Sequence, residues 1–140
     1  MKKTLMLVLL ACLILGSCNK YDEGPSLSLR SKTHRLCGTW SLSEIYINNL
    51  LQPAGTPSSW EIKTNGSCTR TSTDAYSQAE TTISGTWAFN NDKTIVDITW
   101  EIPSLSMTII ENWTVLRLKE KELWLEASLY GNIIQNRLTQ

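Results

Sequence analysis

Apolar and polar side chains alternate along most of the chain after Leu36, and turn-forming residues interrupt this alternation at short intervals. The clearest case is the segment 94–102, in which Val96, Ile98 and Trp100 occupy every second position. A period of two residues places such side chains on one face of an extended strand, whereas an amphipathic helix repeats every 3.6 residues. No segment shows a convincing helical stripe, so the pattern predicts a chain of β-strands.

Eight strands are expected, and several of their ends are marked by individual residues. Asn65-Gly66 is a strong hairpin signal, and Pro103 ends a strand because proline cannot donate to the ladder. The alternation changes parity near Glu44, which predicts a β-bulge. The expected strands are residues 38–47, 60–63, 67–73, 81–90, 94–102, 107–118, 122–128 and 133–139.

Short turns between consecutive strands favour an antiparallel meander, which makes the protein all-β. The six tryptophans of the chain need a shared core. A flat sheet of eight strands would leave two edges unpaired, whereas closure into an up-and-down barrel pairs every strand. We therefore predict an eight-stranded antiparallel barrel, with a two-sheet β-sandwich as the alternative.

The first residues have the order of features found in a signal peptide. Lys2 and Lys3 precede an apolar run over residues 5–15, which is too short to cross a membrane as a helix. Leu15-Gly16-Ser17-Cys18 resembles the bacterial lipoprotein box, so we expect residues 1–17 to be removed and Cys18 to be acylated, with palmitate among the attached chains. A competing box ends at Cys12, but cleavage there would leave apolar residues exposed on the mature protein.

Residues 18–35 are polar and lack periodicity, which predicts a flexible tether between the lipid and the barrel. Each buried lipid CH₂ contributes about 0.8 kcal/mol, so several acyl chains would hold the protein at the outer membrane. Asp22-Glu23 resembles the acidic signals that some Bacteroidetes lipoproteins use to reach the cell surface, and a solvated linker explains the pair equally well. The location therefore stays open between the periplasmic side and the surface.

The charge of the chain gives no indication of a nucleic-acid partner. Of the 13 Lys and Arg residues, Lys2 and Lys3 lie in the signal segment, which leaves 11 basic against 13 acidic residues. No basic stripe or cluster is present, and such a stripe is the usual mark of a protein that binds nucleic acid.

Gly38-Thr39-Trp40 resembles the Gly-x-Trp signature that begins the first strand of lipocalins, and the order of later motifs is similar to the lipocalin-like lipoproteins of Bacteroidetes. Those motifs are Trp60-Glu61-Ile62, Ser84-Gly85-Thr86-Trp87, Asn91-Asp92-Lys93-Thr94, Trp113-Thr114-Val115 and Glu122-Leu123-Trp124-Leu125.

The resemblance implies an eight-stranded barrel over residues 36–140 and no particular reaction. It also implies that Gly38 and Trp40 close one barrel end and that an arginine packs over the Trp40 ring, with Arg137 the first candidate and Arg117 the second.

No set of residues predicts catalysis, a cofactor or a metal. The single histidine, His34, lies in the expected tether, and no Gly-x-Ser-x-Gly motif is present. His34, Cys37 and Cys68 make three candidate ligands, whereas a structural zinc takes four. Glu101 and Glu111 could be considered as a carboxylate pair, but outward solvated charges are the expectation.

Cys37 and Cys68 leave two interpretations open, because an exported protein can form disulfides. In a meander they begin the first and third strands at the same barrel end, about 9–10 Å apart. A disulfide needs Cα atoms within about 7 Å, so a bridge requires Cys37 to curl toward the Asn65-Gly66 turn. Two separate thiols are the alternative.

Four aromatic residues are the candidates for a pocket lining, because alternation directs them inward: Trp87, Phe89, Trp100 and Trp113. The interior of an eight-stranded barrel is either filled by side chains or holds one small ligand. Two functions follow. One is a non-enzymatic protein that binds a small apolar or amphipathic ligand, and the other is a structural or interaction module of the cell envelope with a filled barrel and an unspecified protein partner. A third, an inhibitor of host enzymes, fits the scaffold but no particular residue.

Overall fold

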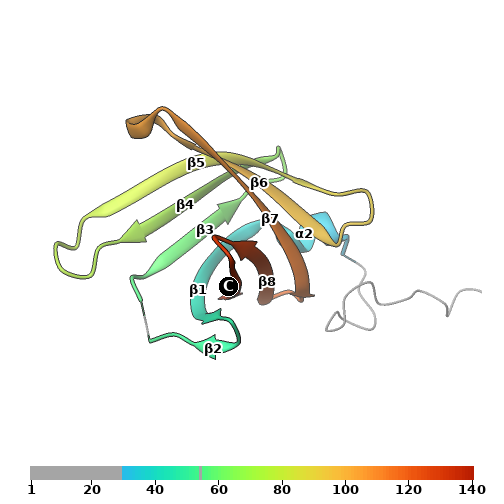
Figure 1. Cartoon of the computed structure of the whole chain (residues 1–140). Helices are drawn as coiled ribbons and strands as arrows, with labels where there is room; N and C mark the ends of the chain where they lie inside the picture. Colours follow the sequence, from blue (N-terminus) through green and yellow to red (C-terminus); the bar gives the residue numbers. More distant parts are fainter. Residues whose placement is uncertain (1–29, 54) are drawn as a thin grey trace, which may run out of the picture.

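The computed structural model describes residues 30–53 and 55–140, and nearly all of its regular structure is β-strand (Figure 1). The predicted signal peptide, Cys18 and most of the predicted tether lie outside the described residues. The elements are α2 (Lys32–Leu36), β1 (Gly38–Ile47), β2 (Leu50–Leu51), β3 (Ser58–Ile62), β4 (Ser67–Thr73), β5 (Glu80–Phe89), β6 (Ile95–Ile102), the 3₁₀ turn η1 (Pro103–Leu105), β7 (Met107–Leu118), β8 (Glu122–Leu129) and β9 (Asn132–Thr139).

The strands form one closed antiparallel barrel. Their order is β2-β1-β3-β4-β5-β6-β7-β8-β9, and a further pairing of β1 with β9 closes the sheet. Eight strands make the barrel, while the two-residue strand β2 pairs only with the end of β1. The predicted up-and-down barrel is confirmed, and the sandwich is excluded because a single sheet pairs with itself.

Two β-bulges bend the barrel wall. The register between β1 and β9 shifts between Leu42 and Glu44, where the sequence pattern predicts a bulge. A second shift, between Val115 and Arg117 in β7, was not expected. A bulge inserts an unpaired residue and increases the local bend of a strand, so both shifts help a short sheet to close on itself.

The helix α2 covers one end of the barrel, which we call the capped end. Trp40 Nε1 donates to the Leu36 carbonyl at 2.8 Å, and Arg35 Nη1 donates to the Leu118 carbonyl at 3.0 Å. Leu36 is fully buried, and the Ser31 side chain caps the helix by accepting from the His34 N–H. The predicted flexible tether is therefore wrong for its last residues, because they form this helix.

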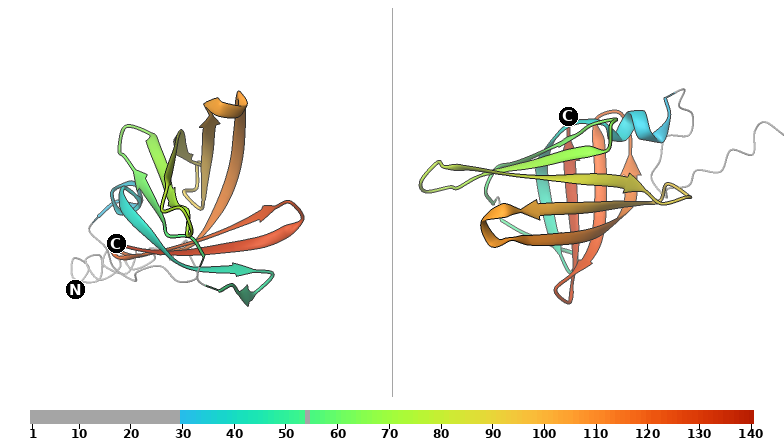
Figure 2. Two further views of the ribbon diagram at one scale, coloured as in Figure 1. Left: turned by 90° about the vertical axis from the view of Figure 1, so that its left-hand side faces the viewer. Right: turned by 90° about the horizontal axis from the view of Figure 1, so that it is seen from above.

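The barrel widens away from α2, toward what we call the open end. Figure 2 shows the β6–β7 and β8–β9 hairpins diverging in that direction. The loops at the open end include residues 48–53 with 55–57, 74–79, 103–106 and 130–131, since these connect the strand ends opposite α2. Among the described residues, no helix has the length and apolar character needed to span a bilayer.

The hydrophobic core fills the barrel from the capped end to its middle. Inward positions recur at every second residue along each strand, as the sequence alternation predicts. The largest fully buried side chains include Trp40, Trp60, Trp100, Trp113, Ile98, Leu118, Leu123, Leu125 and Leu138.

Candidate functional site in the barrel mouth

A cavity of about 260 Å³ lies inside the barrel toward its open end, and we call this part of the barrel the mouth. Strands β3 and β4 contribute the inward side chains of alternate positions, which are Ser58 and Trp60 on one and Arg70 and Ser72 on the other. The remaining lining residues are Leu42, Ile45, Gly55, Thr56 and Asn136. The lining combines apolar, hydroxyl, amide and cationic groups, as a pocket for a small organic ligand does.

Trp60 forms the floor of this cavity, and two further tryptophans pack behind it. The Trp60 ring packs edge-to-face against the rings of Trp100 and Trp113, with centroid distances of 5.8 Å in both pairs. Edge-to-face contacts of this kind stabilise a cluster beyond its area of burial, by about 0.5–1.5 kcal/mol per pair. All three side chains are at most 2% exposed, so the cavity ends at this layer.

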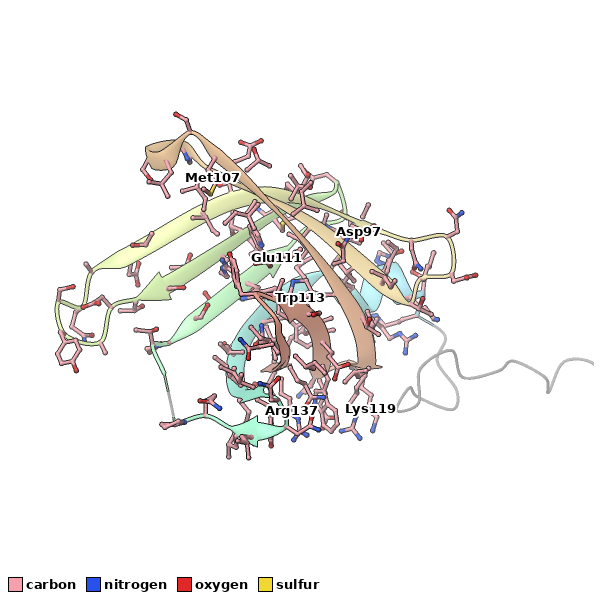
Figure 3. All side chains as sticks on the ribbon, in the orientation of Figure 1. Asp97, Met107, Glu111, Trp113, Lys119 and Arg137 are labelled. Carbon is pink, nitrogen blue, oxygen red and sulfur yellow. The ribbon has the colours of Figure 1, made fainter. Side chains whose placement is uncertain are left out.

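Glu111 lies in the same layer and is 7% exposed (Figure 3). Its Oε2 atom accepts from Trp100 Nε1 at 2.8 Å and from Trp113 Nε1 at 2.9 Å. The expectation of an outward charge is wrong for Glu111, because β7 pairs it with the inward Ile98 of β6. Glu101 is exposed, as expected.

Arg70 joins the tryptophan layer to the cavity. Its guanidinium carbon lies 4.9 Å from the Trp100 ring centroid and 5.8 Å from that of Trp60. Arg70 Nη1 is 3.7 Å from Glu111 Oε1, an ion pair longer than a hydrogen bond. The Arg70 side chain is 28% exposed, and it lines the cavity.

A second hollow, of about 410 Å³, adjoins the cavity between β1 and the segment that follows β2. The two share Leu42, Ile45, Gly55 and Thr56, so they meet along one wall. The second hollow adds the apolar side chains of Leu51, Pro53 and Pro57 and the polar residues Ser43, Glu44 and Gln52. A molecule held near Arg70 would therefore find an apolar surface beside it.

The predicted pocket residues occupy the core near the cavity and do not line it. Trp100 and Trp113 lie behind Trp60. Trp87 and Phe89 pack on each other at 5.6 Å nearer the capped end, where Trp87 Nε1 donates to the Lys63 carbonyl.

Sequence reasoning missed the residues that do line the cavity. It selected only aromatic residues for the lining, so Arg70 and Ser72 in the expected strand 67–73 were not considered. The signal was present, because Cys68, Arg70 and Ser72 share one parity and Cys68 is buried.

The prediction that Arg137 packs over Trp40 is wrong. In β9, Leu138 faces inward opposite Leu42, so its neighbour Arg137 points to the outside of the barrel. There the Arg137 guanidinium lies 4.1 Å from the Trp124 ring and 4.4 Å from the Tyr46 ring, and it bonds Glu44 at 3.0 Å.

The second candidate for that stack is also on the outer side. Arg117 lies 4.0 Å from the Trp124 ring, so Arg117 and Arg137 pack on the same indole. Trp40 itself is fully buried at the capped end, where α2 takes the place expected for an arginine. The helix was not expected because five residues are too few to show a helical period.

Gly38 has a φ of +152°, a conformation that L-residues other than glycine rarely adopt. A side chain there would also meet the Gln140 side chain. A substitution of Gly38 would therefore strain the backbone at the start of β1.

Cys37 and Cys68 are both free thiols, which excludes the disulfide left open by the sequence. Strand β3 lies between them, since Gly38 pairs with Ile62 and Ile62 pairs with Cys68. Burial raises the pKa of the Cys68 thiol to about 11, and burial also raises that of Cys37. Both groups are therefore protonated and poorly nucleophilic near neutral pH.

The described part of the chain contains no group of three or more His, Cys, Asp or Glu side chains placed to hold a metal ion. The chain matches no protein-family model, and no curated protein is significantly similar to it in sequence. The assignment of the fold therefore rests on strand order and closure.

Proposed function

We propose that this protein is a non-enzymatic, membrane-anchored bacterial lipoprotein whose lipocalin-like barrel binds one small apolar or amphipathic ligand. The observation that carries the proposal is the cavity of about 260 Å³ lined by Trp60, Arg70 and Asn136. Ligand pockets usually measure about 300–1,000 Å³, and the adjoining hollow of about 410 Å³ brings the site into that range.

The chemistry of the mouth supports binding rather than catalysis. A nucleophile needs a general base within hydrogen-bond reach. The carboxylate nearest the cavity, Glu111, accepts two indole N–H groups with one oxygen and faces Arg70 with the other. The hydroxyls of Ser58 and Ser72 contact each other, so among the described residues they have no base.

A titration followed by tryptophan fluorescence tests the proposal, because Trp60 borders the cavity. Fatty acids, bile acids and haem-like compounds should each be added to the full-length protein, and at least one class should shift or quench the emission saturably. Ser72→Phe fills the cavity and should abolish the response. Thr69→Phe is the matched control, since Thr69 faces outward on the same strand. The mouth is not the binding site if none of the compounds changes the tryptophan emission, or if the change persists in Ser72→Phe.

The anchor is tested separately, since Cys18 lies outside the described residues. Cells fed labelled palmitate should label the wild-type protein and Cys12→Ala, but not Cys18→Ala. If Cys12→Ala loses the label instead, Cys12 rather than Cys18 is the lipidated cysteine. Protease treatment of whole cells should then distinguish surface exposure from the periplasmic side of the outer membrane.

A second candidate function is the structural or interaction module, and the loops at the open end favour it. Each of the four loops, or a strand end beside it, exposes a large apolar side chain: Leu50 70%, Tyr76 97%, Leu105 66% and Tyr130 89%. A partner recovered with wild-type protein but not with Tyr130→Ser would support this function. Recovery of the bare monomer from solubilised envelope would oppose it.

A further inference from the structure

We propose that the ligand of this barrel carries an anionic head group and that the Arg70 guanidinium binds it inside the mouth. This inference rests on the proposed function, because it names the class of ligand for the same cavity. It follows from two polar side chains in the lining that have no hydrogen-bond partner among the described residues.

The first is Arg70. A guanidinium offers five N–H donors, and groups of this kind seek acceptors once they leave bulk water. Within residues 30–53 and 55–140 no atom accepts a hydrogen bond from Arg70, and its ion pair with Glu111 spans 3.7 Å. The face of the guanidinium is covered by the Trp100 ring, so its donor edges are the part left for a ligand.

The second is Asn136, which is 7% exposed and lines the same cavity. Its side-chain amide has no hydrogen-bond partner in the described part of the chain, and its atoms are not among the fully buried ones, so the amide is accessible from the cavity that it lines. The hydroxyls of Ser58 and Ser72 lie in the same lining, 3.4 Å apart. The cavity therefore offers a charged donor, a neutral amide and two hydroxyls together.

The Glu111 carboxylate does not make the cavity a binding site for cations. Its Oε2 already accepts two indole N–H groups, and its Oε1 faces Arg70. The carboxylate thus lies in the floor, behind the guanidinium, and it is not among the residues that line the cavity. The other acidic group nearby, Glu44, is bound by Arg137 and by the Tyr46 hydroxyl.

The rest of the site suits an apolar tail. The two hollows share Leu42, Ile45, Gly55 and Thr56, and the second hollow adds the apolar Leu51, Pro53 and Pro57. Its polar lining residues are Ser43, Gln52 and Glu44, and the Glu44 carboxylate is already bound by Arg137. A carboxylate or phosphate accepts two N–H groups of one arginine in parallel, which fixes the head group by geometry as well as charge. The site thus fits a small amphiphile with an anionic head near Arg70 and a short alkyl or ring system against Leu42.

Four probes with the same chain test the inference: octanoate, octyl phosphate, octylamine and octanol. Their affinities are measured by tryptophan fluorescence on the full-length protein in zwitterionic lipid nanodiscs, with empty nanodiscs as the blank. The anionic probes should bind about 10- to 100-fold more tightly than octanol, and octylamine should bind most weakly. The order of octanoate and octyl phosphate then tells whether the natural head group is a carboxylate or a phosphate ester.

Arg70→Gln should remove the preference for the anions while leaving the affinity for octanol within about threefold. Arg117→Gln is the matched control, because Arg117 also stacks on a tryptophan but on the outer side of the barrel. Arg70→Lys keeps the charge and should retain the order of the probes with a smaller ratio. The comparison of head groups on the wild-type protein needs no variant and decides the question even if Arg70→Gln does not fold.

Different results would overturn the anionic head group and ligand binding itself. If octanol or octylamine binds as tightly as octanoate, or if Arg70→Gln keeps the anion preference, the head-group inference is overturned and ligand binding stands. If none of the four probes binds and the broader panel of apolar compounds also gives no response, ligand binding in the mouth is overturned as well.

Discussion

Replacing Glu111 with alanine should destabilise the barrel by about 3 kcal/mol. The carboxylate is the acceptor for two buried indole N–H groups, those of Trp100 and Trp113, at 2.8 and 2.9 Å. A buried donor left without an acceptor costs about 1–3 kcal/mol, so two of them set a range of about 2–6 kcal/mol. Removing the buried carboxylate also removes its desolvation cost, which places the expected loss in the lower half of that range.

Two further variants separate the acceptor from the charge. Glu111→Gln keeps an oxygen in place for the indoles and loses only the ionic share, so its cost should be about 1 kcal/mol or less. Glu101→Ala is the matched control, because Glu101 is an exposed glutamate on the neighbouring strand. Exposed substitutions of this kind usually change stability by less than about 0.5 kcal/mol.

Equilibrium unfolding in urea, followed by far-UV circular dichroism, measures all three. Fluorescence is less suitable here because the substitutions change the surroundings of the reporting tryptophans. A domain of this size is stable by about 5–15 kcal/mol, so a loss of 3 kcal/mol lowers the midpoint visibly. If Glu111→Ala and Glu101→Ala lose the same free energy within about 0.5 kcal/mol, the reasoning from unpaired buried donors is refuted.

Four other changes test separate parts of the structure. Trp40→Ala empties the fully buried site under α2 and should cost about 3–5 kcal/mol in urea unfolding, and a loss below 1 kcal/mol would contradict its role. Gly85→Ala should cost about 1–3 kcal/mol, because a methyl group there meets the Thr99 carbonyl and the Trp100 ring, whereas Gly55→Ala meets nothing and should be neutral. Arg137→Met should cost about 0.5–2 kcal/mol through loss of the stacks on Trp124 and Tyr46, and it should leave the near-UV spectrum of Trp40 unchanged. Since burial raises the pKa of Cys68 from 9.0 to about 11, the stability due to the neutral thiol is complete below pH 9 and is lost as the pH rises toward 11; Cys68→Ala should flatten that decline.

The strand pattern was predictable because burial in this barrel follows the two-residue period closely. The positions of Val96, Ile98 and Trp100 show this, since all three are fully buried. The bulge beside Glu44 was predictable for the same reason, because it shifts the parity of the inward side chains. Alternation needs no knowledge of the partner strand, so the sequence carries it locally.

The polar residues of the mouth were harder to predict, because parity and polarity disagree there. Glu111 has the parity of Trp113, which predicts an inward side chain, yet an acidic residue is usually solvated, which predicts an outward one. The two indole donors to its carboxylate come from two strands, Trp100 from β6 and Trp113 from β7, so its burial depends on the register of β6 against β7. A register across a sheet is not visible in one segment of sequence.

The prediction that Arg137 packs over the Trp40 ring was wrong for a related reason. The family resemblance supplied a partner for Trp40, but the parity of Leu138 fixes its neighbour on the outer face. The true neighbour of Trp40 is the short helix α2, which forms because Leu36 is buried under the barrel end and because Ser31 caps it. Packing stabilises this helix, and a stretch of five residues would not be helical by itself.

The inward face of β4 changes in character between its two ends, and this gradient argues for a ligand rather than for a filled module. Along β4 the inward residues run from the buried Cys68 through Arg70 to Ser72, and on β9 the polar Asn136 lies between the inward Leu138 and Ile134. A barrel that only needed to be filled would continue with apolar residues, because an unpaired buried polar group lowers stability. Arg70 and Asn136 make no side-chain hydrogen bond within the described residues, and both line the cavity, where a ligand can supply acceptors. On this argument, Arg70→Met should cost the free protein no more than about 0.5–2 kcal/mol, the value of the stacks on Trp100 and Trp60, while it removes the binding of octanoate. If Arg70→Met instead destabilises the free protein by more than about 2 kcal/mol in urea unfolding, the pairing of Arg70 with Glu111 is structural and the gradient loses its functional meaning.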